Sequence, residues 1–178
     1  MLGKLAGLAV GLSMSSMALA VDFMDSEWAA QICEAWNDNK ELTEGLYKVD
    51  SNDDAYSWIK NDAGRGYKMI QIYRSKCGEA SRIQLNIVME EDKAMCAYGG
   101  VPDGKEMNSK VDYVMYAKDK HWTCMGSGKC GVMGSMMKRK LRFKGPKMEA
   151  MQVMSPFGSF LRLTGEVPGD KGECKVAG

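Results

Sequence analysis

Six cysteines and one histidine are the residues of this chain whose types could support thiol or metal chemistry. His121 lies three positions before Cys124, close enough in sequence for an imidazole to act as the base of a reactive thiol. No C-x-x-C pair accompanies the single histidine, and zinc sites usually draw on closely spaced cysteine and histidine pairs. The sequence therefore predicts no metal ligand and no cofactor, and we expect His121 to cap or pack at the start of a helix.

The first twenty residues have the composition of a secretory signal peptide. Lys4 carries their sole charge, residues 5–12 form an apolar core, and residues 18–20 read Ala-Leu-Ala, an A-x-A cleavage site. A membrane anchor is the alternative, but a spanning helix needs about 20 apolar residues and this run is shorter. We predict that residues 1–20 are a signal peptide and that residues 21–178 form a single domain, periplasmic or secreted.

The even number of cysteines in an exported chain predicts disulfides rather than a free catalytic thiolate. Cys124 and Cys130 enclose a five-residue loop with two glycines, which can close without strain. The expected strand register places Cys96 on the covered face of a sheet, beside a helix that carries Cys33. The remaining two cysteines then pair with each other, which gives the pairs Cys33–Cys96, Cys77–Cys174 and Cys124–Cys130.

Charge and missing motifs narrow the functional classes. Without Lys4 the basic and acidic residues are equal in number, 23 of each. A general nucleic-acid binder needs a positive excess to displace counterions, so this class is excluded. The chain contains no G-x-S-x-G elbow, phosphate loop or dinucleotide fingerprint. We predict a protein that is not an enzyme.

Methionine and phenylalanine are concentrated near the C-terminus. Seven of the 13 methionines after residue 20 lie between positions 125 and 154, and three of them recur every third residue from position 148. Methionine is flexible and polarizable, so it adapts to a bulky apolar guest, although an ordinary core is the usual explanation of such a stripe. The predicted ligand-binding residues are Met133, Met136, Met137, Phe143, Met148, Met151, Met154, Phe157, Phe160 and Leu161.

The same region contains a predicted break in a helix and a basic strand. Ser155-Pro156 is expected to divide the C-terminal helix, because proline favours a first turn and disrupts an interior. The two pieces would form a hinged lid. Residues 138–147 include six basic residues, which either form a solvated outer face or contact anionic headgroups. We predict transient contact with a membrane surface through Lys140, Arg142 and Lys144.

Hydrophobic periodicity predicts an α+β domain. Helices are expected over residues 25–36 and 53–60, and strands over residues 67–75, 82–90, 94–98, 111–117 and 138–144. In the second strand Ile83, Leu85, Ile87 and Met89 alternate with Arg82, Gln84, Asn86 and Glu90, which indicates one covered face and one face in water. The prediction is a single, mostly antiparallel five-stranded sheet with helices covering one face and an apolar cavity between them.

Residues 125–165 resemble the C-terminal half of the sterol carrier protein 2 family. In that family a Met/Gly/Lys turn, an apolar helix, a basic strand and a closing apolar helix follow one another. Residues 125–129, 132–137, 139–145 and the segment from Lys147 have the corresponding character here. The resemblance implies an antiparallel sheet covered by helices, with a ligand in an apolar tunnel between the two that the C-terminal helix closes.

Together these features predict non-enzymatic binding and transfer of a hydrophobic lipid, such as a sterol or an acyl chain. Burial of ~400 Å² of apolar surface would contribute about 10 kcal/mol before the costs of association. Two alternatives remain open. One is a structural or accessory envelope protein with a filled core and no ligand, and the other is a protein that presents a quinone-like substrate to an enzyme.

Overall fold

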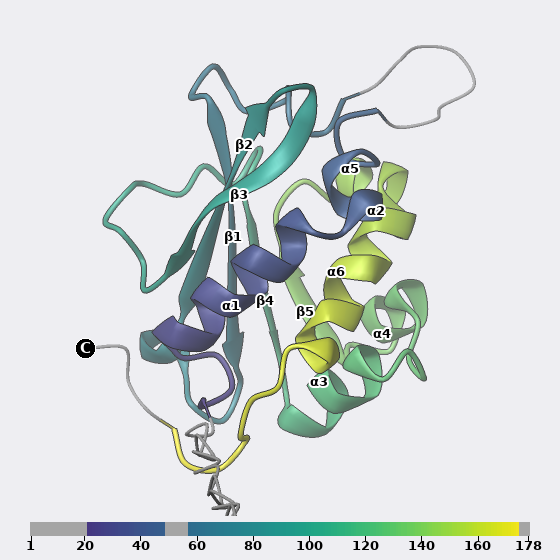
Figure 1. The fold of residues 1–178 in the computed structure, drawn as a ribbon. Coiled ribbons are helices and arrows are strands. Elements are labelled where there is room, and N and C mark those ends of the chain that lie inside the picture. The colour runs from purple at the N-terminus through teal and green to yellow at the C-terminus, as the bar shows by residue number, and fades with distance from the viewer. Residues whose placement is uncertain (1–20, 49–56, 175–178) are drawn as a thin grey trace, which may run out of the picture.

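The computed structural model describes residues 21–48 and 57–174, which form a layer of helices packed on one face of a sheet (Figure 1). The five strands lie in the order β3-β2-β1-β4-β5. Their bounds are β1 Tyr67–Arg74, β2 Ile83–Glu90, β3 Lys93–Gly100, β4 Tyr113–Ala117 and β5 Leu141–Lys144. The helices are α1 Ser26–Asn37, α2 Lys40–Thr43, α3 Asp119–Gly126, α4 Val132–Met137, α5 Lys147–Gln152 and α6 Met154–Glu166, with a short 3₁₀ helix at Glu79–Ser81.

The predicted α+β class and five-stranded sheet are confirmed. Strand β2 pairs antiparallel with β1 and β3, and β4 pairs antiparallel with β5. The exception is the parallel pair β1–β4, which the long connection from β3 to β4 makes possible. Among the described residues no helix is long and apolar enough to cross a membrane.

Helix α1 follows its sequence pattern closely. Asp25 caps it by accepting a hydrogen bond from the Trp28 backbone N–H at 2.8 Å, and one side of the helix is buried against β3. The helix approaches that strand at Gly99, where a Cβ atom would lie 2.0 Å from the Ala29 carbonyl oxygen. A side chain at position 99 would therefore push the helix away from the sheet.

All three predicted disulfides are present. Cys96 lies opposite Ile87 in the register, as expected, and bonds to Cys33 of α1. The other pairs are Cys77–Cys174, which ties the last described residues to the end of β1, and Cys124–Cys130. No cysteine is free among the residues that the structure describes, which include all six.

The predicted helix over residues 53–60 is wrong where the structure describes it. Residues 58–60 form a turn, and residues 53–56 lie outside the described part of the chain. A short helix occurs earlier, as α2, because Asn39 accepts a hydrogen bond from the Leu42 backbone N–H at 3.2 Å and restarts the helix after α1. Asn39 lies in the polar run of residues 37–40, directly after the predicted first helix, and it caps the second helix.

The predicted wet face of the sheet is covered near β1 and β2. Gln84 and Asn86, which face away from the helices, are 0% and 4% exposed. The connection from β3 to β4 crosses this face, and Asp103 within it accepts hydrogen bonds from both amides at 2.8 and 2.9 Å (Figure 1). Conversely, Met89 is half exposed, because β2 continues past the end of the helix layer.

Candidate ligand-binding site

The C-terminal helical segment is divided in two, as predicted, but at a different residue. Helix α5 ends at Gln152, and Val153 (φ −112°, ψ 34°) leaves the helical conformation before α6 begins at Met154. Pro156 then lies in the first turn of α6. Backbone N–H groups in a first turn have no partner within the helix, so the N–H that proline lacks costs no helical hydrogen bond. The break therefore precedes the predicted Ser155-Pro156 position by two residues.

An apolar pocket lies beneath this divided helix, between it and the sheet. Its walls come from α1, α2, β1, β4, α5, α6 and the segments beside α2 and β1: Trp36, Leu42, Leu46, Trp58, Ile70, Tyr113, Ala150, Val153, Pro156, Phe157 and Phe160. The empty space is about 20 Å³, which is room for roughly one water molecule. The pocket is therefore almost filled by its own side chains.

Aromatic rings provide most of that filling. The Phe160 ring lies 5.7 Å from Trp36, and the Trp58 and Tyr113 rings stack at 5.8 Å. Phe157 contacts Phe143 edge to face at 6.0 Å. Any guest must therefore displace one or more of these rings, and those on α6 move if the helix moves.

A buried ion pair borders the pocket on the side of β1 and β4. Lys68 of β1 is fully buried, and its Nζ lies 2.8 Å from both carboxylate oxygens of Glu149 on α5. The Tyr113 hydroxyl donates to Glu149, and the Trp58 Nε1–H donates to the Tyr113 oxygen at 2.9 Å. Asn61 Nδ2 donates to the same carboxylate at 2.7 Å. Trp58 and Tyr113 thus belong both to this polar cluster and to the apolar wall.

The charge of Lys68 is strongly influenced by its surroundings. Burial lowers the pKa of the ammonium group, and the hydrogen bond and charge of Glu149 act in the opposite direction. The ammonium also lies 4.3 Å from the centre of the Trp58 ring, a cation–π distance. Since α5 supplies the carboxylate, outward movement of α5 would leave a buried cation at the edge of an apolar pocket.

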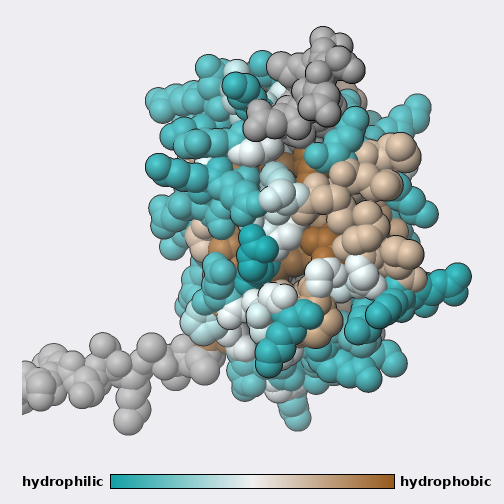
Figure 2. Space-filling view, turned by 90° about the vertical axis from the view of Figure 1, so that its right-hand side faces the viewer, coloured by the Kyte–Doolittle hydropathy of each residue, from teal (hydrophilic) through white to brown (hydrophobic). Residues whose placement is uncertain are grey.

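The predicted ligand-binding residues lie in four different places. Phe157 and Phe160 line the pocket, while Met136 and Phe143 are partly buried against the core. A second hollow, an open groove of about 370 Å³ between α4 and α6, is lined in part by Met133, Met154 and Leu161. Met137, Met148 and Met151 are exposed at 76%, 76% and 52%, on the helix side where Figure 2 shows a pale brown apolar area.

The outward direction of Met148 and Met151 corrects the prediction that Met151 faces an interior guest. The reason is the rotation of α5. Glu149 and Ala150, which lie between the two methionines in sequence, are buried, and the bond from Glu149 to Lys68 fixes that side of the helix toward the sheet. Lys68 and Glu149 were not predicted from the sequence, although a lysine on the same face of a strand as Ile70 and Ile72 was a detectable signal.

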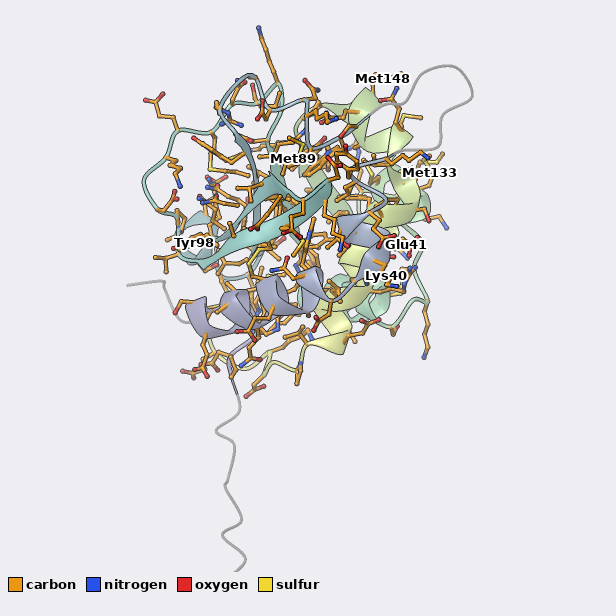
Figure 3. All side chains as sticks on the ribbon, turned by 45° about the horizontal axis from the view of Figure 1, so that its top comes forward. Lys40, Glu41, Met89, Tyr98, Met133 and Met148 are labelled. Carbon is orange, nitrogen blue, oxygen red and sulfur yellow. A yellow bond between two sulfur atoms is a disulfide. The ribbon has the colours of Figure 1, made fainter. Side chains whose placement is uncertain are left out.

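Helix α6 is held in place by polar and close backbone contacts. Glu41 of α2, labelled in Figure 3, accepts hydrogen bonds from Ser155 and Ser159, and Arg162 lies 3.2 Å away. The hydrogen bonds from Ser155 and Ser159, with the charge of Arg162, lower the pKa of Glu41 below its ordinary value of 4.5. At the other end, Gly165 contacts Gly126 of α3 so closely that a Cβ on either would meet backbone within 2.7 Å.

The groups considered for thiol and metal chemistry do not form a reactive site. Cys124 is in a disulfide, and His121 lies in the first turn of α3, where burial and the nearby Lys120 and Lys140 lower its pKa. Among the described residues no group of three or more histidine, cysteine, aspartate or glutamate side chains could hold a metal ion.

Comparison with solved structures identifies the fold. A crystal structure of sterol carrier protein 2 superposes with a TM-score of 0.50 and 13% identity, over 82% of this chain and 99% of that chain. The solution structure of a conserved hypothetical protein from Thermus thermophilus, described as possibly a sterol carrier protein, gives 0.50 and 13%, over 87% and 96%. Neither a protein-family model nor a curated protein sequence matches the chain. The chain therefore has the sterol carrier protein 2 fold, and the predicted resemblance is confirmed at the level of the fold.

Proposed function

We propose that this protein binds a hydrophobic lipid, a sterol or a long acyl chain, between its sheet and the α5–α6 segment, without catalysis. The observation that carries the proposal is the wholly apolar pocket beneath a helix divided at Val153, in the sterol carrier protein 2 fold. Apolar walls favour an apolar guest because burial removes its surface from water, at about 25 cal/mol per Å².

Binding in this pocket requires an opening movement. A cavity of about 20 Å³ holds no acyl chain, so the guest takes the space that Phe157 and Phe160 now fill. The irregular backbone at Val153 allows α5, which closes the pocket through Ala150, to move separately from α6, and the side chains of Phe157 and Phe160 then have room to rotate. The binding free energy is then the gain from burying the apolar surface of the guest, reduced by the cost of opening the pocket. A guest with a large apolar surface is therefore favoured.

We also propose that the protein acts outside the cytoplasm and delivers its guest at a membrane. Residues 1–20, which lie outside the described part, would be the export signal. Three disulfides support an oxidising compartment. The predicted membrane contact through Lys140, Arg142 and Lys144 belongs to this proposal, and Arg142 and Lys144 are exposed.

The small size of the cavity favours a second candidate function. With its interior filled by its own aromatic rings, the same fold could serve as a structural or accessory envelope protein without a ligand. Presentation of a quinone-like substrate to an enzyme uses the same pocket as lipid binding, and the identity of a bound molecule separates the two.

Native mass spectrometry and probe titration test the proposal. Protein purified without detergent is expected to carry lipid, and delipidated protein should bind a fluorescent fatty acid or a fluorescent sterol. Phe160→Leu keeps the core apolar while enlarging the pocket, so we expect a severalfold change in probe dissociation constant. Met89→Leu, at an exposed site that does not line the pocket, is the control. If no lipid co-purifies and neither probe binds the wild type, the filled-core alternative is correct.

A further inference from the structure

All five large hydrophobic side chains that are exposed among the described residues are methionines. Four of them lie on two short helices: Met133 and Met137 on α4, and Met148 and Met151 on α5. We call these four side chains the methionine face. The fifth, Met89, lies on the sheet near the end of β2; Figure 3 labels it together with Met133 and Met148. Exposed apolar groups that gather on one surface commonly mark a site of interaction.

The methionine face continues into the open groove between α4 and α6. Met133 belongs to both, and the groove is lined further by Met154, Val132 and Leu161. Gly131, Gly134 and Gly158 also line it, and the lack of side chains there contributes to its width. The face is therefore a hollowed apolar surface with adaptable side chains.

Positive charge is concentrated beside this surface, and Glu41 of α2 is the acidic residue that contacts Ser155 and Arg162 of the groove wall. Residues 127–165 contain eight basic residues and one acidic residue, Glu149, which is buried and paired with Lys68. Lys138 and Arg139 directly follow Met137, Lys147 directly precedes Met148, and all three are exposed. The whole chain carries a net charge of only +1, so its positive charge is concentrated on this segment.

We infer that the methionine face docks on the surface of an anionic lipid bilayer. The methionines enter the boundary between headgroups and acyl chains, while Lys138, Arg139 and Lys147 contact the anionic headgroups. Each cation near such a surface contributes favourably, and the apolar side chains add the burial of their surface. Flexible methionines suit a fluid partner, which presents no fixed shape to match.

This docking surface differs from the basic strand predicted from the sequence. Arg142 and Lys144 alternate in β5 with Leu141 and Phe143, which turn toward the helix layer, so their side chains project from the other face of the sheet. Lys144 lies there 3.6 Å from Glu79. The inference rests on the proposed function in one respect: a guest that leaves the pocket past α5, which carries Met148 and Met151, enters the bilayer directly.

Sedimentation with vesicles tests the inference. Vesicles of phosphatidylcholine and phosphatidylglycerol in equal parts should bind the wild type, and vesicles of phosphatidylcholine alone should bind it much more weakly. The triple variant Met137→Ser, Met148→Ser, Met151→Ser should bind the anionic vesicles roughly tenfold more weakly. Met89→Ser is the matched control, with an exposed methionine outside the face, and should bind like the wild type.

A second variant separates the contribution of charge. Lys138→Gln, Arg139→Gln, Lys147→Gln should also weaken binding roughly tenfold and should reduce its dependence on salt. Unchanged melting temperatures would show that both triple variants remain folded, since every altered side chain is exposed.

The outcomes distinguish docking from lipid binding. Equal binding of the methionine variant and the Met89→Ser control, or equal binding of wild type to both kinds of vesicle, would overturn the inference. Probe binding in solution, measured without vesicles, tests the proposed function separately. Probe binding without vesicle binding would support the proposed function and contradict the docking surface. Vesicle binding without probe binding would support the docking surface and contradict the proposed function.

Discussion

Lys68 and Glu149 show how a single ion pair can determine which residues a helix exposes. The pair joins β1 to α5 in surroundings that exclude water, where desolvation makes each charge costly unless the other is present. Because Glu149 must face the sheet, Met148 and Met151 face solvent. The part of the methionine face that lies on α5 thus follows from one buried carboxylate.

The first prediction concerns this pair. Lys68→Met leaves the Glu149 carboxylate buried without its cation, so we expect a loss of about 3–5 kcal/mol in the free energy of unfolding. The double variant Lys68→Met, Glu149→Met replaces both charges with apolar groups and should recover most of that loss. Urea denaturation of the wild type, both single variants and the double variant measures the coupling. Additive losses would show that the two charges do not depend on each other.

The second prediction concerns Glu41. Its pKa is lowered in the folded protein by Ser155 and Ser159, so its carboxylate stabilises the folded state fully above the ordinary value of 4.5. That stabilisation is lost as the pH falls through the lowered, folded-state pKa. We expect the melting temperature of the wild type to fall more steeply below about pH 4.5 than that of Glu41→Gln. Parallel curves for the two proteins would contradict the assigned role.

At the scale of elements, the features that local chemistry determines could be predicted from the sequence. Asp25 caps α1 because its carboxylate reaches the Trp28 N–H, and the alternation of Ile83, Leu85 and Ile87 turns those residues toward the helices. The Cys33–Cys96 pair followed from that register. These features depend on residues close in sequence or directly paired across strands.

Features that depend on distant partners were not predicted. The face of β2 that carries Gln84 and Asn86 is covered because Asp103, in a later loop, satisfies both amides. The rotation of α5 depends on Lys68, 81 residues before Glu149. Periodicity within a segment contains no information on such contacts, so the division of the candidate site into a filled pocket, a groove and an exposed face could not be derived from it.

The third prediction concerns the separate movement of α5 and α6. Helix α5 has six residues and is joined to the sheet through Glu149, whereas α6 is held by Glu41 and by the close contact of Gly165 with Gly126. Glu149→Gln should therefore increase amide hydrogen exchange in residues 147–152 roughly tenfold while leaving α6 nearly unchanged. Mass-spectrometric exchange measures this, with Glu166→Gln as the control. Equal acceleration in both helices would mean that they open as one unit.

At the scale of the whole molecule, the disulfides connect the two ends of the described chain to its core. Cys33–Cys96 closes a separation of 63 residues and joins the helix layer to the sheet, and Cys77–Cys174 closes 97. The third, Cys124–Cys130, spans six residues within one turn. A cross-link restricts the unfolded chain more when the loop that it closes is longer.

The fourth prediction follows from these separations. By the chain-entropy relation, replacing Cys33 and Cys96 with alanine should cost about 4 kcal/mol, and replacing Cys124 and Cys130 about 2 kcal/mol. Denaturant unfolding of the two double variants measures the difference in stability loss. Each variant loses two sulfur atoms, so the two losses can be compared directly. The Cys124–Cys130 turn also forms part of the groove wall through Gly128 and Cys130, so its variant should change vesicle binding more than its small stability loss suggests. A loss at the short loop equal to that at the long one would show that the disulfides act on the folded structure rather than on the unfolded chain.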